Sequence, residues 1–136
     1  MKPADILKLT QMVHLATVDG ECPRLRPMTM IWYDKAFFFA TSAGDNKARH
    51  LQENPNAEWC LLLPGDNCTG YLKGSGILQK VDDARLRKAV ADKARFLYDY
   101  WQSPTDPDFV LYRMQVQSLR LMPPGAMYEE DVSSEL

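Results

Sequence analysis

The 136-residue chain is 46% hydrophobic and 25% charged, which is the composition of one globular domain with a substantial core. Its net charge of −2 gives no overall attraction to nucleic acid or to an anionic membrane. It has no apolar run near the roughly 20 residues that span a bilayer, and no signal-peptide core. Three cysteines without CxxC spacing fit a reducing compartment. We therefore expect a cytoplasmic domain over residues 1–128 and an acidic flexible tail over 129–136.

The first third of the chain predicts a short helix followed by three antiparallel strands. Pro3 near its start and an apolar side favour a helix over Pro3–Met12. Tight-turn signals at Asp19-Gly20 and Asp34-Lys35 separate the apolar segments that follow. The three expected strands are Val13–Val18, Arg24–Tyr33 and Phe37–Ser42.

The second of these strands has no polar face. Met28, Met30 and Trp32 alternate with Thr29 and Ile31, so apolar residues fall on both sides of the strand. A sheet with one wet face alternates more simply. Closure into a small barrel, covered outside by a helix or a second subunit, accounts for both apolar faces.

Two hydroxyls, a turn and a short helix follow the third strand. Thr41 and Ser42 end the strand, and Asp45 or Asn46 is placed to cap the helix. Lys47 falls in the first helical turn, where a bare cation is unfavourable against the helix dipole. A bound anion removes this penalty, and helix N-termini bind phosphate. The segment therefore predicts a phosphate site.

The rest of the chain predicts two strands, a long helix and a last strand. The short helix ends at Asn54-Pro55, and three glycines indicate bends in the fifth strand. A change in the parity of apolar residues predicts a bulge near Gln117-Ser118. The fold class is mainly β: a six-stranded antiparallel barrel with peripheral helices. The remaining expected elements are strands Ala57–Leu63 and Cys68–Val81, a helix capped by Asp82 or Asp83 and ending at Ser103, and a strand from Val110 to Leu121.

Five short segments between His14 and Met122 are more specific together than any one alone. They are Leu15-Ala16-Thr17-Val18-Asp19-Gly20, Pro23-Arg24-Leu25-Arg26-Pro27-Met28, Phe39-Ala40-Thr41-Ser42 with Lys47-Ala48, Leu51 with Asn54-Pro55, and Gly70-Tyr71-Leu72-Lys73-Gly74-Ser75-Gly76. Their order and spacing resemble the pyridoxamine-phosphate-oxidase-like, FMN-binding split-barrel family. The resemblance implies a homodimer with its cofactor sites at the subunit interface. It favours the general-stress-protein or flavin-binding branch over the true oxidases.

The resemblance also implies roles for individual residues. Arg26 matches an arginine that helps bind the FMN phosphate, and Lys47 matches the phosphate-binding lysine. Thr41 matches the hydroxyl that ends the third strand, and Ser42 lies beside it. Residues 27 to 31 match the strand that passes the flavin largely through backbone groups. The implied cofactor-binding set is Arg26, Pro27, Met28, Thr29, Met30, Thr41, Ser42, Lys47 and Tyr71, the last being nearest to a glutamine of the family's fifth strand.

The chain departs from the oxidases at two places. Asn46 precedes Lys47 where the oxidases carry an Arg-Lys pair. The C-terminal Trp and Arg-His pair that hold pyridoxamine phosphate are replaced by Pro123–Tyr128. These differences argue against pyridoxamine-phosphate oxidase activity and leave the catalytic residues unknown.

Other chemistry-bearing side chains have simpler interpretations. His50 is a candidate general base, but we favour an ordinary surface or interface histidine, and the same holds for His14. Neither has a Ser or Cys partner at catalytic spacing, and no cluster has metal-ligand spacing, so we expect no metal. We expect Tyr98, Tyr100 and Trp101 in the core rather than over a flavin ring, Cys60 buried, and Arg85, Arg87 and Lys88 on a solvated helix face.

Three hypotheses follow. The first is an FMN-binding flavoprotein with oxidoreductase chemistry on an unidentified small molecule. The alternative is a non-catalytic module that binds, stores or senses flavin or haem. A barrel that binds single-stranded nucleic acid is disfavoured by the net charge of −2, so we expect neither nucleic acid nor membrane as partner.

Overall fold

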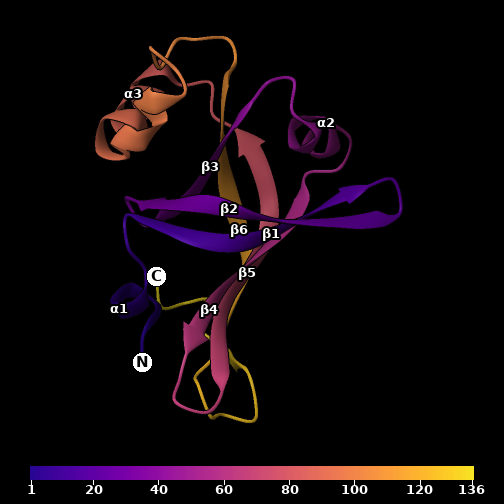
Figure 1. Ribbon diagram of the computed structural model, residues 1–136, viewed down its shortest axis with the longest axis vertical. Helices are drawn as coiled ribbons and strands as arrows, with labels where there is room; N and C mark the ends of the chain where they lie inside the picture. Colours follow the sequence, from indigo (N-terminus) through magenta and orange to yellow (C-terminus); the bar gives the residue numbers. More distant parts are fainter.

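Six long antiparallel strands close into a barrel in the computed structural model, which describes residues 1–136 (Figure 1). The sheet order is β3-β2-β1-β4-β5-β6, and β3 pairs with β6 to close the circle. The short β7 extends the sheet beyond β6. This confirms the predicted fold class. The strands are β1 (Thr10–Asp19), β2 (Cys22–Tyr33), β3 (Ala36–Ser42), β4 (Asn56–Pro64), β5 (Thr69–Lys80), β6 (Phe109–Met122) and β7 (Glu130–Asp131).

Three helices and one 3-10 helix lie outside the barrel: α1 (Pro3–Ile6), α2 (Asn46–Glu53), α3 (Ala84–Lys93) and η1 (Arg95–Asp99). In Figure 1, α2 lies beside the C-terminal end of β5, and α3 lies at the same end of the molecule. Asp45 caps α2, and Asp83 caps α3 by accepting from two backbone N–H groups. None of the helices has the length and apolar character needed to cross a membrane.

Two predicted helices have different limits in the structure. The first ends at Ile6 rather than Met12, because Thr10 already pairs with Ile31 in the sheet. The long helix predicted to reach Ser103 stops at Lys93, since Ala94 has a non-helical backbone, and the chain continues as the 3-10 helix η1. The tighter 3-10 turn still buries the next apolar residue, Leu97.

The acidic C-terminal segment is folded, although we expected a flexible tail. Glu130 and Asp131 pair with β6, and the following Val132 is buried in the core. The Ser133 hydroxyl oxygen accepts from the Leu119 N–H at 2.9 Å, and its proton is donated to the Asp131 carboxylate at 2.6 Å. Residues 130–133 therefore extend one edge of the sheet.

The predicted bulge lies in β6 and is matched by a glycine in β5. Ser75 pairs with Ser118 and Gly76 with Val116, which leaves Gln117 as the extra residue. A Cβ atom on Gly76 would collide with the carbonyl oxygen of residue 115. The bulge prediction is therefore confirmed.

The core has two parts, one inside the barrel and one between the barrel and α3. Met30 of β2 belongs to the inner part and its neighbour Ile31 to the outer part, and both are fully buried. This explains why β2 has two apolar faces. The inner core includes Leu15, Phe37, Phe39, Trp59, Leu72 and Leu121, and the outer core includes Phe38, Val90, Leu97, Trp101, Phe109 and Leu111.

Candidate functional site

A cavity of about 260 Å³ opens where β3 ends and α2 begins. The two hydroxyl residues that end β3 form one side, and Lys47 and its neighbour Asp45 form another. The aromatic residues of η1 and the turn after it form an apolar wall. Five of the nine residues implied by the family resemblance line this cavity: Met28, Thr29, Thr41, Ser42 and Lys47.

Thr41 presents an unused donor to this cavity. Its side chain is buried, but its hydroxyl makes no hydrogen bond to the protein. The only fully enclosed side-chain atoms without a partner are the indole nitrogens of Trp32 and Trp59. The Thr41 hydroxyl is thus open to the cavity, where a ligand atom can accept its hydrogen bond.

Lys47 is not a bare cation, because it forms an ion pair with the residue that caps its own helix. Its Nζ lies 2.8 Å from Asp45 Oδ1, and its backbone N–H donates to the same oxygen. Partial burial raises the pKa of the Asp45 carboxyl, but the hydrogen bonds from Lys47 outweigh this and hold the pKa below its ordinary value. The Asp45 carboxylate therefore already offsets the unfavourable position of the Lys47 charge in the first turn of α2, which we had taken as a sign of a bound anion.

Arg26 acts on the same carboxylate, although it does not line the cavity. Its Nη1 donates to the backbone oxygen of Leu15 at 3.2 Å. Partial burial lowers the pKa of the Arg26 guanidinium, while the negative charge of Asp45 raises it. The positive charges of Lys47 and Arg26 therefore both lower the pKa of Asp45.

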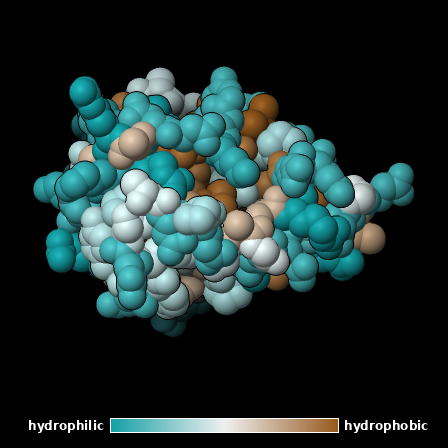
Figure 2. Space-filling view, turned by 90° about the horizontal axis from the view of Figure 1, so that it is seen from above, coloured by the Kyte–Doolittle hydropathy of each residue, from teal (hydrophilic) through white to brown (hydrophobic).

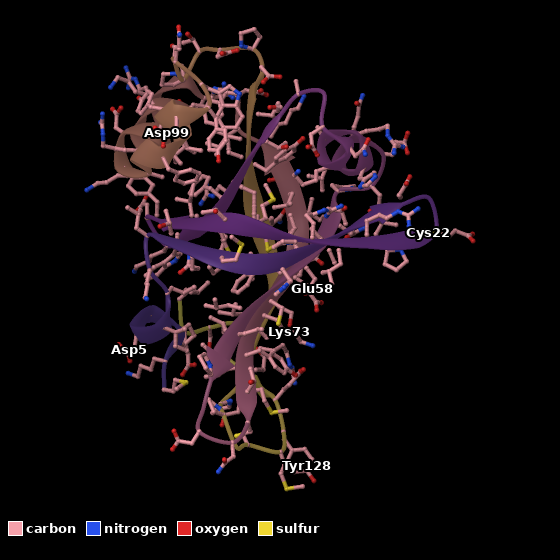
Figure 3. The ribbon with its side chains drawn as sticks, viewed as in Figure 1. Asp5, Cys22, Glu58, Lys73, Asp99 and Tyr128 are labelled. Atoms are coloured by element: carbon pink, nitrogen blue, oxygen red, sulfur yellow. The ribbon has the colours of Figure 1, made fainter.

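The structure separates three of the implied residues from the cavity. Met30 is enclosed in the barrel interior and Pro27 is exposed on the outer face of β2. Tyr71 lies on the part of β5 distant from α2; Figure 3 labels its neighbour Lys73 in that half of the molecule. The Tyr71 hydroxyl donates to Glu129, which also accepts from Lys73 at 2.8 Å. Within one chain, Tyr71 therefore cannot share a ligand with Lys47.

His50 is a buried link between α2 and β1, so the interpretation as an ordinary surface or interface histidine was wrong. Its side chain is 4% exposed, and its Nδ1 lies 3.1 Å from the hydroxyl of Thr17. Its Nε2 lies 3.6 Å from a carboxylate oxygen of Asp19. Both side chains are buried, and the contacts of the histidine with Thr17 and Asp19 position α2 against β1.

The contacts made by Asp108 and Arg87 were not predicted from the sequence. Asp108 accepts from the backbone N–H of Ala43 and from the Trp101 indole, both at 3.1 Å, and so joins the apolar wall to the end of β3. Arg87, which we expected to be solvated, donates to the backbone oxygens of Pro104 and Phe109 at 2.8 and 2.7 Å. It holds the loop before β6 against α3.

Three aromatic residues and one cysteine are partly where we expected them. Trp101 is buried and Tyr98 is half-buried, whereas Tyr100 is largely exposed; Trp101 and Tyr100 also line the cavity. Cys60 is half-buried rather than buried. The aromatic wall is therefore available to a ligand that enters the cavity from this chain's own side.

The sequence of the chain also matches a known protein family. The family model described as "Pyridoxamine 5'-phosphate oxidase" matches residues 2–123. The chain belongs to this family. The match covers all six barrel strands and the whole candidate site.

Solved structures with the same fold are distant in sequence. General Stress Protein 26 from Bacillus anthracis is 20% identical, with a TM-score of 0.69 over 90% of this chain and 89% of that one. A NimC/NimA family protein from Clostridium acetobutylicum is 16% identical, with a TM-score of 0.74 over 94% and 87%. HutZ, a haem storage protein from Vibrio cholerae, is 19% identical, with a TM-score of 0.66 over 86% and 89%. At these identities the likeness shows the fold alone.

Proposed function

We propose that this chain is an FMN-binding flavoprotein whose cavity between β3 and α2 holds the phosphate end of the cofactor. The observation that carries the proposal is that Thr41, Ser42 and Lys47 all line one cavity, with the Thr41 hydroxyl free of any partner in the protein. Hydrogen bonds to a charged group contribute about 1.5–3 kcal/mol each, so two or three of them retain a phosphate. Family membership supports the proposal, because flavin binding is a known property of this family.

The residues fit a phosphate, although Asp45 makes the fit less favourable. A phosphate must compete with the Asp45 carboxylate for the Lys47 ammonium, which now lies 2.8 Å from it. Arg26 adds a second positive charge within range of Asp45. Asn46 stands where the oxidases carry an arginine. We therefore propose weaker phosphate binding than in relatives with an Arg-Lys pair.

Bound FMN supplies the redox chemistry, and the chain supplies position and exclusion of water. The aromatic side chains of Phe96, Tyr100 and Trp101 form an apolar wall beside the phosphate position. The backbone of β2 around Met28 and Thr29 borders the same cavity. The proposed activity is an oxidoreductase acting on a small molecule, with a reduced nicotinamide or a reduced flavin as electron donor.

A second copy of the chain is the proposed partner. Met12, Leu25 and Leu62 lie on the outward face of the adjacent strands β1, β2 and β4, and they are 60%, 68% and 52% exposed. Large exposed apolar side chains on one face mark an interface. Tyr71 would then join the FMN site from the partner copy. Light scattering should give a dimer for the native chain and a monomer for Leu62→Asp.

Haem binding is the second candidate function, and one pair of residues favours it. His14 of β1 and Cys60 of β4 are direct partners across the sheet and lie on its outward face. Both residue types ligate haem iron. Burial raises the pKa of the Cys60 thiol and keeps it neutral, so the His14 imidazole is the better ligand. His50 is buried and cannot serve.

Reconstitution with each cofactor separates the two functions. The FMN proposal predicts a yellow protein that retains flavin through gel filtration and loses it in Thr41→Val. The haem alternative predicts a haem absorbance band that is lost in His14→Ala, with no retained flavin. If native protein given excess FMN elutes colourless, the FMN proposal is wrong.

A further inference from the structure

A second cavity, of about 400 Å³, is lined by α2 and the turn before it, the end of β5 and the start of β6. In Figure 1, α2 and the end of β5 lie side by side at one end of the molecule. Its floor is apolar and includes Ala48, Leu51, Leu78 and Val110. Its size falls in the range of small-molecule sites, and the mouths of β-barrels are common places for such sites. Figure 2, which looks onto this end of the molecule, shows hydrophobic surface between polar side chains.

Tyr112 is the most deeply buried of the polar residues that line this second cavity. The Tyr112 side chain is 4% exposed, and its hydroxyl makes no hydrogen bond in the structure. It is not one of the fully enclosed atoms that lack a partner, so it opens onto the cavity. Burial raises the pKa of Tyr112, which keeps the phenol protonated as a hydrogen-bond donor at neutral pH. A buried donor without a partner is unfavourable unless a ligand or water accepts from it.

The charges around the second cavity favour an anion with a single charge. Lys80 lines the cavity and forms no ion pair within the protein. Arg49 also lines it, with its guanidinium 3.4 Å from Asp19. Asp45 also lines this cavity, whereas its partner Lys47 lines only the first cavity, so the carboxylate disfavours a dianion such as phosphate here. Gln52 adds an amide that can donate a further hydrogen bond.

We propose that this second cavity binds a small organic carboxylic acid with an apolar body. The carboxylate accepts from the Tyr112 hydroxyl and pairs with the Lys80 ammonium, and the apolar body covers the floor. The second cavity shares only Asp45 with the proposed FMN phosphate cavity. The proposal therefore stands or falls independently of flavin binding.

The probe for the experiment is 4-fluorobenzoate, observed by fluorine NMR with the protein as purified and no added FMN. We expect saturable binding, with 4-fluorobenzyl alcohol, which carries no charge, binding at least tenfold more weakly. Tyr112→Phe keeps the ring and should weaken the acid about tenfold, as for loss of one hydrogen bond to a charged group. Lys80→Gln should weaken it roughly three- to fivefold, as for an exposed charge pair.

Lys93→Gln is the matched control, because Lys93 is an exposed lysine on α3 that does not line the second cavity. It should leave the affinity for 4-fluorobenzoate unchanged. Circular dichroism of each variant checks that the barrel is folded. The proposal is overturned if 4-fluorobenzoate does not bind, if the alcohol binds equally well, or if folded Tyr112→Phe and Lys80→Gln both bind like the native protein.

Discussion

Asp45 and Glu129 are two carboxylates at separate parts of the barrel, and each is held by basic side chains. Glu129 accepts from Tyr71, Lys73 and Arg120, so each donor around it already has its partner. Asp45 accepts from Lys47 alone, beside a cavity that contains the unpartnered hydroxyl of Thr41. Similar charges therefore produce a closed structural cluster in one place and a site with spare donors in the other.

The difference arises from where each carboxylate lies in the fold. Glu129 follows the turn after β6, and β7 holds it over the sheet face formed by β5 and β6. Asp45 caps a short helix that leaves the barrel, so one side of the carboxylate faces the gap between β3 and η1. A ligand can therefore approach Asp45 without displacing a strand, whereas it cannot approach Glu129 in this way.

The largest effect is expected for Lys47→Met. If the Asp45 cavity is the FMN phosphate site, the affinity for FMN should fall about 10- to 100-fold, as for loss of one or two charged hydrogen bonds. Removal of the lysine also leaves the Asp45 charge uncompensated, which acts in the same direction. Quenching of flavin fluorescence on titration measures this affinity. Lys93→Met, on exposed surface of α3, should bind FMN like the native chain; equal binding by Lys47→Met would place the cofactor elsewhere.

The second prediction concerns the closed cluster and pH. Hydrogen bonds from Lys73 and Tyr71 lower the pKa of Glu129 from 4.5 to about 2 in the folded protein. A lowered folded pKa stabilises the native state above the unfolded pKa, and this contribution is lost as the pH falls from 4.5 towards 2. Thermal unfolding of the native chain should therefore show a loss of stability in that range.

Glu129→Gln should lack this part of the pH dependence, because an amide does not titrate. Its midpoint temperature should lie below that of the native chain at neutral pH, and the two should converge as the pH approaches 2. In the monomeric chain, the substitution should not change the affinity for FMN. A constant gap between the two unfolding curves at all pH values would show that Glu129 contributes by shape rather than by charge.

Local patterns were sufficient to predict the barrel. The turn at Asp34-Lys35 was visible as a polar pair between apolar segments, and both residues adopt positive φ, at 51° and 60°. The bulge at Gln117 was visible as a change of parity along one strand. Each of these features depends on residues within a few positions of one another, so periodicity reports them.

Contacts across the barrel were not predictable in the same way. The His50–Thr17 pair joins residues 33 positions apart, and the bond from Arg87 to the Phe109 carbonyl spans 22. Neither residue type carries a local sign of its partner. At the candidate site, by contrast, the missed contact is local, because Asp45 and Lys47 are two residues apart. The sequence identified Asp45 as a helix cap, but we did not consider it as the partner of Lys47.

The smallest effect, and the sharpest test of the comparison, is expected for Asp45→Asn. Asparagine is as good a helix cap as aspartate, so α2 should remain intact. The substitution removes the negative charge that competes with a phosphate for Lys47, and the affinity for FMN should rise roughly two- to fivefold, as for one partly exposed charge. Asp83→Asn, which makes the same change at the cap of α3, is the matched control and should leave FMN binding unaltered. A fall in affinity for Asp45→Asn would mean that Asp45 holds Lys47 in its binding position, so that this carboxylate, like Glu129, is part of a preformed structure.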